Sequence, residues 1–298
     1  MNTNTNNQLN KSWGSSWVGI AAVVGLLALS AVVAGSSQVG ITVDDSIWKV
    51  VAIGWVAFAA MVGGAWLGGR ATDTDPFGLV WGYGLASGAM ITSAAMFLVP
   101  QAIGLGGRSG SPRIGGIGLA LGVIAGYSAH TVGHRLTHLD LPMDVTAAQI
   151  TAHALSAGAI IGIVYGSMPS LGLLLGLAIV SHKGPAGYAA ARRLNRDGRP
   201  LSVLLLPAAA VGITALPTAL LPVADQPVVN AIVFGFAAGI FLHVAMDFLP
   251  KCETGSEIDQ VLALDEESHH LLDRLRTHAV ASTVIGGVAV VAAWLVVG

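Results

Sequence analysis

Nine apolar stretches dominate this chain, and each is long enough to cross a membrane as a helix. About 20 consecutive apolar residues span the core of a bilayer. The stretches cover residues 17–36, 46–68, 78–103, 114–135, 146–166, 170–191, 201–222, 227–249 and 277–297. Only 10% of all residues are charged, against about 25% in a typical soluble domain. We therefore expect an all-α polytopic membrane protein with about nine transmembrane helices in a lipid bilayer.

The two ends of the chain differ from this core. Residues 1–16 are rich in Asn, Thr and Ser, which predicts a disordered tail. The stretch 17–36 is expected to form an extra transmembrane helix. An alternative is a signal peptide, because Ala31-Val-Val-Ala34 is similar to a cleavage site. An acidic loop is expected over residues 250–276.

The basic residues predict the orientation of the chain, because cytoplasmic loops carry an excess of Lys and Arg. With the N-terminus in the cytoplasm and the C-terminus outside, ten basic residues lie inside and three outside. The inside set is Lys11, Arg70, Arg135, Arg192, Arg193, Arg196, Arg199, Lys251, Arg274 and Arg276, and the outside set is Lys49, Arg108 and Arg113. We expect a multi-pass protein of the plasma membrane. The net charge of −2 gives no indication of a nucleic-acid partner.

Glycines recur every four residues in three of the stretches, which places them on one helix face. They are Gly118, Gly122 and Gly126, then Gly158, Gly162 and Gly166, and finally Gly235 and Gly239. Another helix backbone can approach such a face closely. The pattern predicts a compact helix bundle and says nothing about a substrate.

Two stretches each contain a histidine that is followed five residues later by glycine. They read His153-Ala-Leu-Ser-Ala-Gly158 and His182-Lys-Gly-Pro-Ala-Gly187. Ionisable side chains inside a membrane are costly and indicate a functional site. Neutral imidazole is a common ligand of zinc and similar metal ions. The matched pair therefore predicts a metal site, and the alternative is histidines that only form hydrogen bonds between helices.

The residues expected to shape this site are Pro185, Lys183 and the two motif glycines, Gly158 and Gly187, and Asp247 is expected to border it. Pro185 should interrupt the stretch 170–191 near His182 and release the carbonyl near Ser181 from its helical bond. Such broken helices provide ion sites in transporters. Lys183 needs a partner inside a membrane, and Asp247 is the acidic residue within a stretch that we expect to pair with it.

Other histidines are candidates for a path or a second site. His130, His134 and His138 are spaced four residues apart, which makes a ladder about 12 Å long on one helix face. It either relays a metal ion to the cytoplasm or forms a polar stripe between helices. His243 and Asp247 are further metal candidates. The pair His269-His270 lies in the acidic loop, where a solvated role is expected.

These motifs make the chain similar to the ZIP family of divalent-metal transporters. The family carries His-Asn-x-x-Asp-Gly and His-x-x-Pro-Glu-Gly motifs on its fourth and fifth helices, at the places of His153 to Gly158 and His182 to Gly187. Phe97-Leu-Val-Pro100-Gln101 and Asp247-Phe-Leu-Pro250-Lys251 are similar to its motifs on helices two and seven. The resemblance covers residues 46–298. It implies an eight-helix core with inverted repeats, a metal site near the middle of the membrane and a homodimer.

The chain departs from the family where the family has acidic ligands. Ala154 replaces an asparagine, and Ala157 and Ala186 replace the acidic residues. Lys183 stands at a position that is polar or acidic in the family, where its ammonium takes the place of one of two metal ions. The resemblance then implies a single-metal site dominated by histidine, which favours zinc-like ions.

The function expected from this resemblance is transport of a divalent metal ion, zinc first, toward the cytoplasm. The ion is then the transported substrate, and no cofactor or enzymatic activity is expected. One alternative is a ZIP-like protein that has lost metal transport and regulates or carries another solute. Another is an intramembrane histidine-dependent metalloenzyme, which the His130-x-x-x-His134 spacing and the His269-His270 pair suggest.

Overall fold

The computed structural model describes residues 3–38, 44–71, 76–136, 145–169, 172–221, 226–249 and 268–297, and every regular element in these ranges is helical. The elements are α1 (Thr3–Gln38), α2 (Asp45–Arg70), α3 (Pro76–Ser93), η1 (Ala94–Leu98), α4 (Val99–Arg108), α5 (Arg113–Leu136), α6 (Val145–Ser167), α7 (Leu173–Val180), α8 (Lys183–Arg196), η2 (Leu201–Leu204), α9 (Leu205–Ala219), α10 (Pro227–Phe248) and α12 (Ser268–Val297).

Seven helices among the described residues are long and apolar enough to cross a membrane. They cover Trp17–Gln38, Asp45–Arg70, Pro76–Arg108, Ile150–Ser167, Leu201–Ala219, Pro227–Phe248 and His270–Val296. The chain is thus an all-helical protein with the character of a multi-pass membrane protein, as expected. The other two predicted stretches correspond to α5, whose apolar part is Arg113–Ala129, and to the interrupted pair α7 and α8. The structure therefore does not confirm the number nine.

The apolar helix Pro76–Arg108 contains a π-helical turn, η1, between α3 and α4. Pro100 lies two residues after the end of this turn and lacks the N–H that would bond to the Met96 carbonyl one turn back. A wider turn accommodates the proline ring without ending the helix. The sequence 78–103, predicted as a single crossing, is therefore continuous but locally widened.

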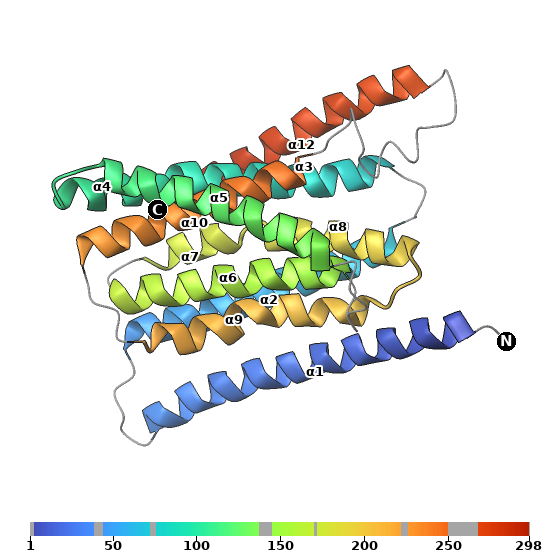
Figure 1. The fold of residues 1–298 in the computed structure, drawn as a ribbon, viewed down its shortest axis with the longest axis horizontal. Coiled ribbons are helices and arrows are strands. Elements are labelled where there is room, and N and C mark those ends of the chain that lie inside the picture. Colours follow the sequence, from blue (N-terminus) through green and yellow to red (C-terminus); the bar gives the residue numbers. More distant parts are fainter. Residues whose placement is uncertain are drawn as a thin grey trace.

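The helices form two groups, which appear as lower and upper layers in Figure 1. In the first group, α2 packs against α8 and α9, while α9 also contacts α6 and α1. In the second group, α10 packs against α5, α4 and α3, and α12 lies along α3. Contacts of α3 with α8 and of α10 with α6 connect the groups. The interrupted pair α7 and α8 packs mainly on α2 of the first group, on the side that also contacts α3 of the second.

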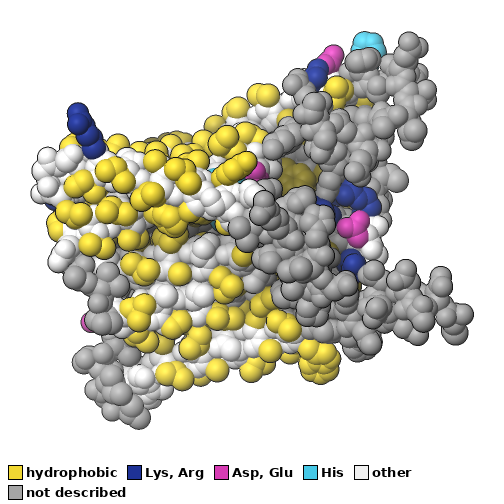
Figure 2. Space-filling model, in the orientation of Figure 1, with side chains coloured by type: hydrophobic (Ala, Val, Ile, Leu, Met, Phe, Trp, Pro, Cys, Tyr) yellow, Lys and Arg dark blue, Asp and Glu magenta, His cyan; other side chains and the backbone are white. Residues whose placement is uncertain are grey.

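The surface of the bundle is apolar along the helices and charged near their ends. Figure 2 shows hydrophobic side chains over the middle of the visible face, with most of the described charged side chains near its two ends. The exposed apolar side chains include Val32 on α1, Ile124 and Tyr127 on α5, and Val280 and Leu295 on α12. Such exposure is unfavourable in water and is expected where lipid covers the helices.

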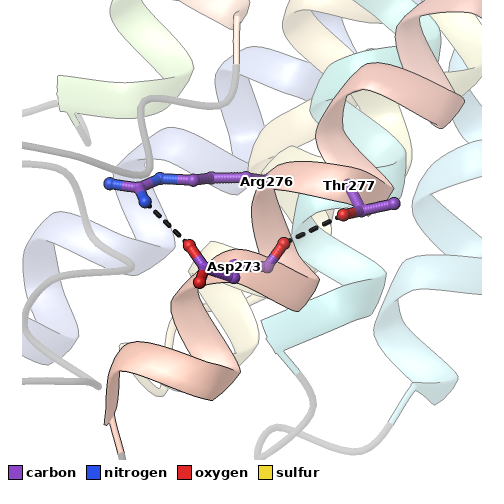
Figure 3. Close-up of polar contacts among 3 residues, drawn as sticks. All are labelled: Asp273, Arg276 and Thr277. Carbon is purple, nitrogen blue, oxygen red and sulfur yellow. Dashed lines mark hydrogen bonds and ion pairs between the residues drawn. The ribbon is translucent and has the colours of Figure 1, made fainter.

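The first and last helices extend the bundle beyond the predicted spans. α1 begins at Thr3, so residues 3–16 are helical here and differ from the disordered tail expected over 1–16. α12 begins at Ser268, inside the segment 250–276 predicted as an acidic loop. Near its start, Arg276 donates a hydrogen bond of 2.9 Å to the Asp273 carboxylate, and the Thr277 hydroxyl donates one of 3.0 Å to the Asp273 carbonyl (Figure 3). These bonds stabilise the start of the helix.

The glycine ladders lie where two backbones come close, which confirms their predicted role. A methyl group on Gly118 or Gly122 would overlap the Ile232 or Phe236 carbonyl of α10. Methyl groups on Gly158 and Gly162 would overlap the backbone of α9 in the same way. Glycine is therefore required at these contacts, because any side chain would push the helices apart.

We predict a small loss of stability when Ser87 on α3 is replaced by alanine. The buried Ser87 hydroxyl donates a 2.8 Å hydrogen bond to the Ala245 carbonyl of α10. That carbonyl also accepts the Leu249 N–H, so the variant leaves no unbonded group behind. We expect Ser87→Ala to lower the free energy of unfolding by about 0.6 kcal/mol, the average for such bonds between membrane helices. Ser36→Ala, at an exposed serine that bonds only within α1, is the control in thermal unfolding.

Candidate functional site

His153 and His182 meet in the interior although they come from different helices. His153 lies eight residues into α6, about 12 Å along a helix about 33 Å long. His182 lies in the turn between α7, which ends at Val180, and α8, which begins at Lys183. Their Nε2 atoms are 3.4 Å apart. The two residues singled out by the matched motifs are thus brought together.

Pro185 explains why the helix is interrupted at His182. It is the third residue of α8 and has no N–H to donate to the Ser181 carbonyl one turn back. The first backbone bond after the proline runs from the Ala186 N–H to the His182 carbonyl, at 3.0 Å. The predicted interruption near His182 is confirmed. It places His182 at a bend, where its ring can reach α6.

Tyr165 fixes the start of the interrupted helix. Its hydroxyl donates a 2.7 Å hydrogen bond to the Gly172 carbonyl and accepts one of 3.0 Å from the Gly176 N–H. The side chain is fully buried on α6. These bonds, to Gly172 just before α7 and to Gly176 within it, hold this short helix against the same α6 that carries His153. The sequence analysis missed Tyr165, and the only signal was a phenol within an apolar stretch.

Phe241 on α10 covers the histidine pair from the second helix group. Its ring lies edge-on to His182, with 5.4 Å between centroids, and is tilted against His153 at 6.2 Å. The two imidazole centroids are 5.6 Å apart. His182 and Phe241 are each only 2% exposed, so bulk water is excluded from this side of the pair. The pair therefore lies at the boundary between the two groups. The sequence offered no signal for Phe241, which is one apolar residue among many.

The separation of the two Nε2 atoms suits a shared metal ion. For Zn–N bonds of about 2.0–2.1 Å in a tetrahedral site, two ligand nitrogens lie about 3.3–3.4 Å apart. The observed separation is 3.4 Å. The same distance is long for a hydrogen bond between the rings. The Nδ1 atom of His153 is buried and has no hydrogen-bond partner, so nothing in the described structure fixes its tautomer.

No acidic ligand completes the pair within the part of the chain that the structure describes. These residues contain no group of three or more His, Cys, Asp and Glu side chains able to hold a metal ion. Ala157 and Ala186 follow the two histidines by four residues each, and both are buried. Methyl groups thus stand one turn away from each histidine. A metal ion here would have two protein ligands from this set, and its other positions would be filled from outside.

Lys183 brings a positive charge next to the pair. It follows His182 directly and is 2% exposed. Among the described residues it makes no ion pair, so the expected partner Asp247 is not bonded to it. Asp247 instead lies 3.3 Å from the His243 ring, one turn earlier on α10. The predicted Lys183–Asp247 pair is therefore wrong for the described structure.

His243 and Asp247 form a separate pair on the other side of α10. Residues two apart on a helix point in nearly opposite directions. Phe241 faces the histidine pair, whereas His243 lies against Gly126 and Tyr127 of α5, with 6.4 Å between the rings of Tyr127 and His243. Asp247 is exposed. The structure thus brings these two predicted ligands together with each other and separates them from His153 and His182.

The remaining candidates are only partly described. His130 and His134 fall on α5, but their side chains lie outside the described structure, as do His138 and the side chain of His269. His270 is exposed on α12. Gly158 and Gly187, predicted to shape the site, pack closely against α9 and against Met61 of α2, respectively. Their role in the structure is to let these helices approach closely.

Comparisons with known proteins add no further information about this site. No known protein family matches this sequence, and no characterised protein matches it. The geometry of the residues is therefore the basis for any functional conclusion.

Proposed function

We propose that this protein transports a divalent metal ion, zinc first, across a membrane through a site formed by His153 and His182. The observation that carries the proposal is the 3.4 Å separation of the two Nε2 atoms, which matches two ligands of one tetrahedral zinc ion. Neutral imidazoles favour zinc-like ions over hard ions such as calcium. We also propose that transport runs toward the cytoplasm and that the protein has nine membrane helices with a ZIP-like core.

The interrupted helix supports a transport role for this site. Transporter sites lie where helices are broken, at the interface between two helix groups. Here the break at residues 181–182 contains one member of the histidine pair, His182. Phe241 of the second group covers the pair. A structural histidine pair would not require a proline-interrupted helix. The combination therefore favours a site that releases its ligand over a static contact.

The direct test is zinc-65 uptake into proteoliposomes containing the purified protein. We expect uptake by the wild type and uptake close to that of empty liposomes for His182→Ala. His278→Ala is the matched control, because His278 lies on α12 and accepts a hydrogen bond from Trp81. This variant should keep its uptake. Equal uptake by wild type and His182→Ala would contradict the proposal, as would the absence of zinc uptake by the wild type.

A second candidate function is carriage of another solute, or regulation, without metal transport. The observation that favours it is the buried Lys183 directly after His182, with alanine where the resemblance predicts acidic ligands. A cation is disfavoured next to an ammonium in a medium of low dielectric constant. Zinc binding by the purified protein separates the two functions, because the second predicts no zinc binding that depends on His153 or His182.

A further inference from the structure

Lys183 is the strongest unexplained charge in the interior. Its side chain is 2% exposed, and no hydrogen bond or ion pair to it occurs among the described residues. A buried ammonium without a counter-charge is strongly unfavourable, so such a group pairs with an opposite charge, binds an anion or loses its proton. An anion bound from outside the described residues would let Lys183 keep its charge here.

The histidine pair, in turn, lacks negative charge and further ligands for a bound metal ion. Two neutral imidazoles leave the charge of a bound divalent ion uncompensated, and they fill two of its four preferred positions. No third His, Cys, Asp or Glu joins them in the described ranges. With Lys183 directly after His182, a bound ion would add two positive charges beside an existing one. In a dry interior this repulsion is large.

One small anion would supply both the missing metal ligand and the missing counter-charge. Bound to the metal ion, it fills an open coordination position, and beside the Lys183 ammonium it supplies the missing counter-charge. We propose that the interior site takes a divalent metal ion together with a small monovalent anion, which binds between the ion and Lys183. This inference rests on the proposed function, and it defines the cargo as a metal–anion complex of lower net charge.

The position of Lys183 at the start of α8 also favours an anion. Lys183 is the first residue of α8, a helix of 14 residues. The first backbone N–H groups of a helix lack helical partners and carry partial positive charge. The His182 residue before it makes no side-chain cap. An anion beside Lys183 would therefore meet both the ammonium and the start of this helix.

The test compares zinc-65 uptake in three potassium salts, with free zinc set equal by an indicator dye. Chloride and acetate are small coordinating anions, and methanesulfonate coordinates zinc weakly. We expect wild-type uptake to be about tenfold faster in chloride or acetate, equivalent to about 1.4 kcal/mol of stabilisation. A preference for chloride over acetate, or the reverse, identifies the class of monoanion. Chloride-36 should enter with the zinc, at about one ion for each zinc ion, a count that follows from filling one coordination position.

Lys183→Met is the decisive variant, because it keeps the length of the side chain and removes its charge. We expect the difference between salts to fall below about twofold, and uptake in methanesulfonate to equal or exceed that of the wild type, since the repulsion is removed. Lys49→Met, at an exposed lysine that bonds the Pro169 carbonyl, is the control and should keep the tenfold difference. Lys183→Arg keeps the charge and should keep part of it.

The outcomes separate this inference from the proposed function. Zinc uptake that depends on His182 but is equal in all three salts would overturn the anion and leave metal transport in place. An anion effect that persists unchanged in Lys183→Met would also overturn it. Absence of zinc uptake and zinc binding in every salt would overturn the proposed function and this inference together.

Discussion

Replacing both His153 and His182 by alanine is expected to weaken zinc binding no further than replacing either one alone. In the proposed function the two nitrogens 3.4 Å apart hold one ion jointly, so removal of one ligand would already destroy the site. We expect each single variant to lose at least about 100-fold in affinity, since even indirect partners of metal ligands cost 10–100-fold. Equilibrium dialysis of purified protein against zinc-65 measures the three affinities.

Independent losses would contradict a shared ion. If the two single losses multiplied in the double variant, His153 and His182 would act at separate places. His243→Ala provides the comparison, because His243 pairs with Asp247 on the opposite side of α10. Its effect on zinc binding at this site should be small, and it should combine independently with that of His153→Ala.

Two glycines on α5 are expected to respond to alanine with opposite signs. A methyl on Gly118 would overlap the Ile232 carbonyl of α10, whereas a methyl on Gly116 meets no atom within 4 Å. We expect Gly118→Ala to lower the free energy of unfolding by about 1–3 kcal/mol, because the helices must separate. Gly116→Ala should be neutral or raise it by up to about 1 kcal/mol, because alanine favours the helix.

The measurement is thermal unfolding of the two purified variants in the same detergent, beside the wild type. Because both substitutions add the same methyl to the same helix, differences in expression, detergent binding and helix propensity cancel. Equal midpoints for Gly118→Ala and Gly116→Ala would show that α5 and α10 are not in close contact at Ile232.

The sequence was sufficient for the features that depend on local chemistry. The apolar stretches predicted helices, and the glycine spacing predicted close packing of their backbones. Pro185 predicted the interruption near His182, because a missing N–H acts on its own helix whatever surrounds it. The matched motifs identified His153 and His182 as a pair, and the structure places their Nε2 atoms 3.4 Å apart.

The features that depend on which helix faces which could not be obtained in this way. Membrane helices are apolar on all sides, so their sequence does not indicate the face that turns inward. The sequence therefore predicts that Asp247 pairs with Lys183, whereas in the structure Asp247 lies on a different face of α10 from Phe241 and pairs with His243. Phe241 itself was missed, because an aromatic residue over the site looks like any other apolar residue in a span.

Both imidazoles belong to the first helix group, whereas the ring that covers them, Phe241, belongs to the second. Sliding or rocking of one group against the other would carry His153 and His182 together and withdraw Phe241 from them. Such a motion changes access to the bound ion without changing its ligands. The ion would then become accessible from one side of the membrane while the affinity of the site stays the same. Its dissociation would therefore depend on the ion concentration on that side and would not require weaker binding.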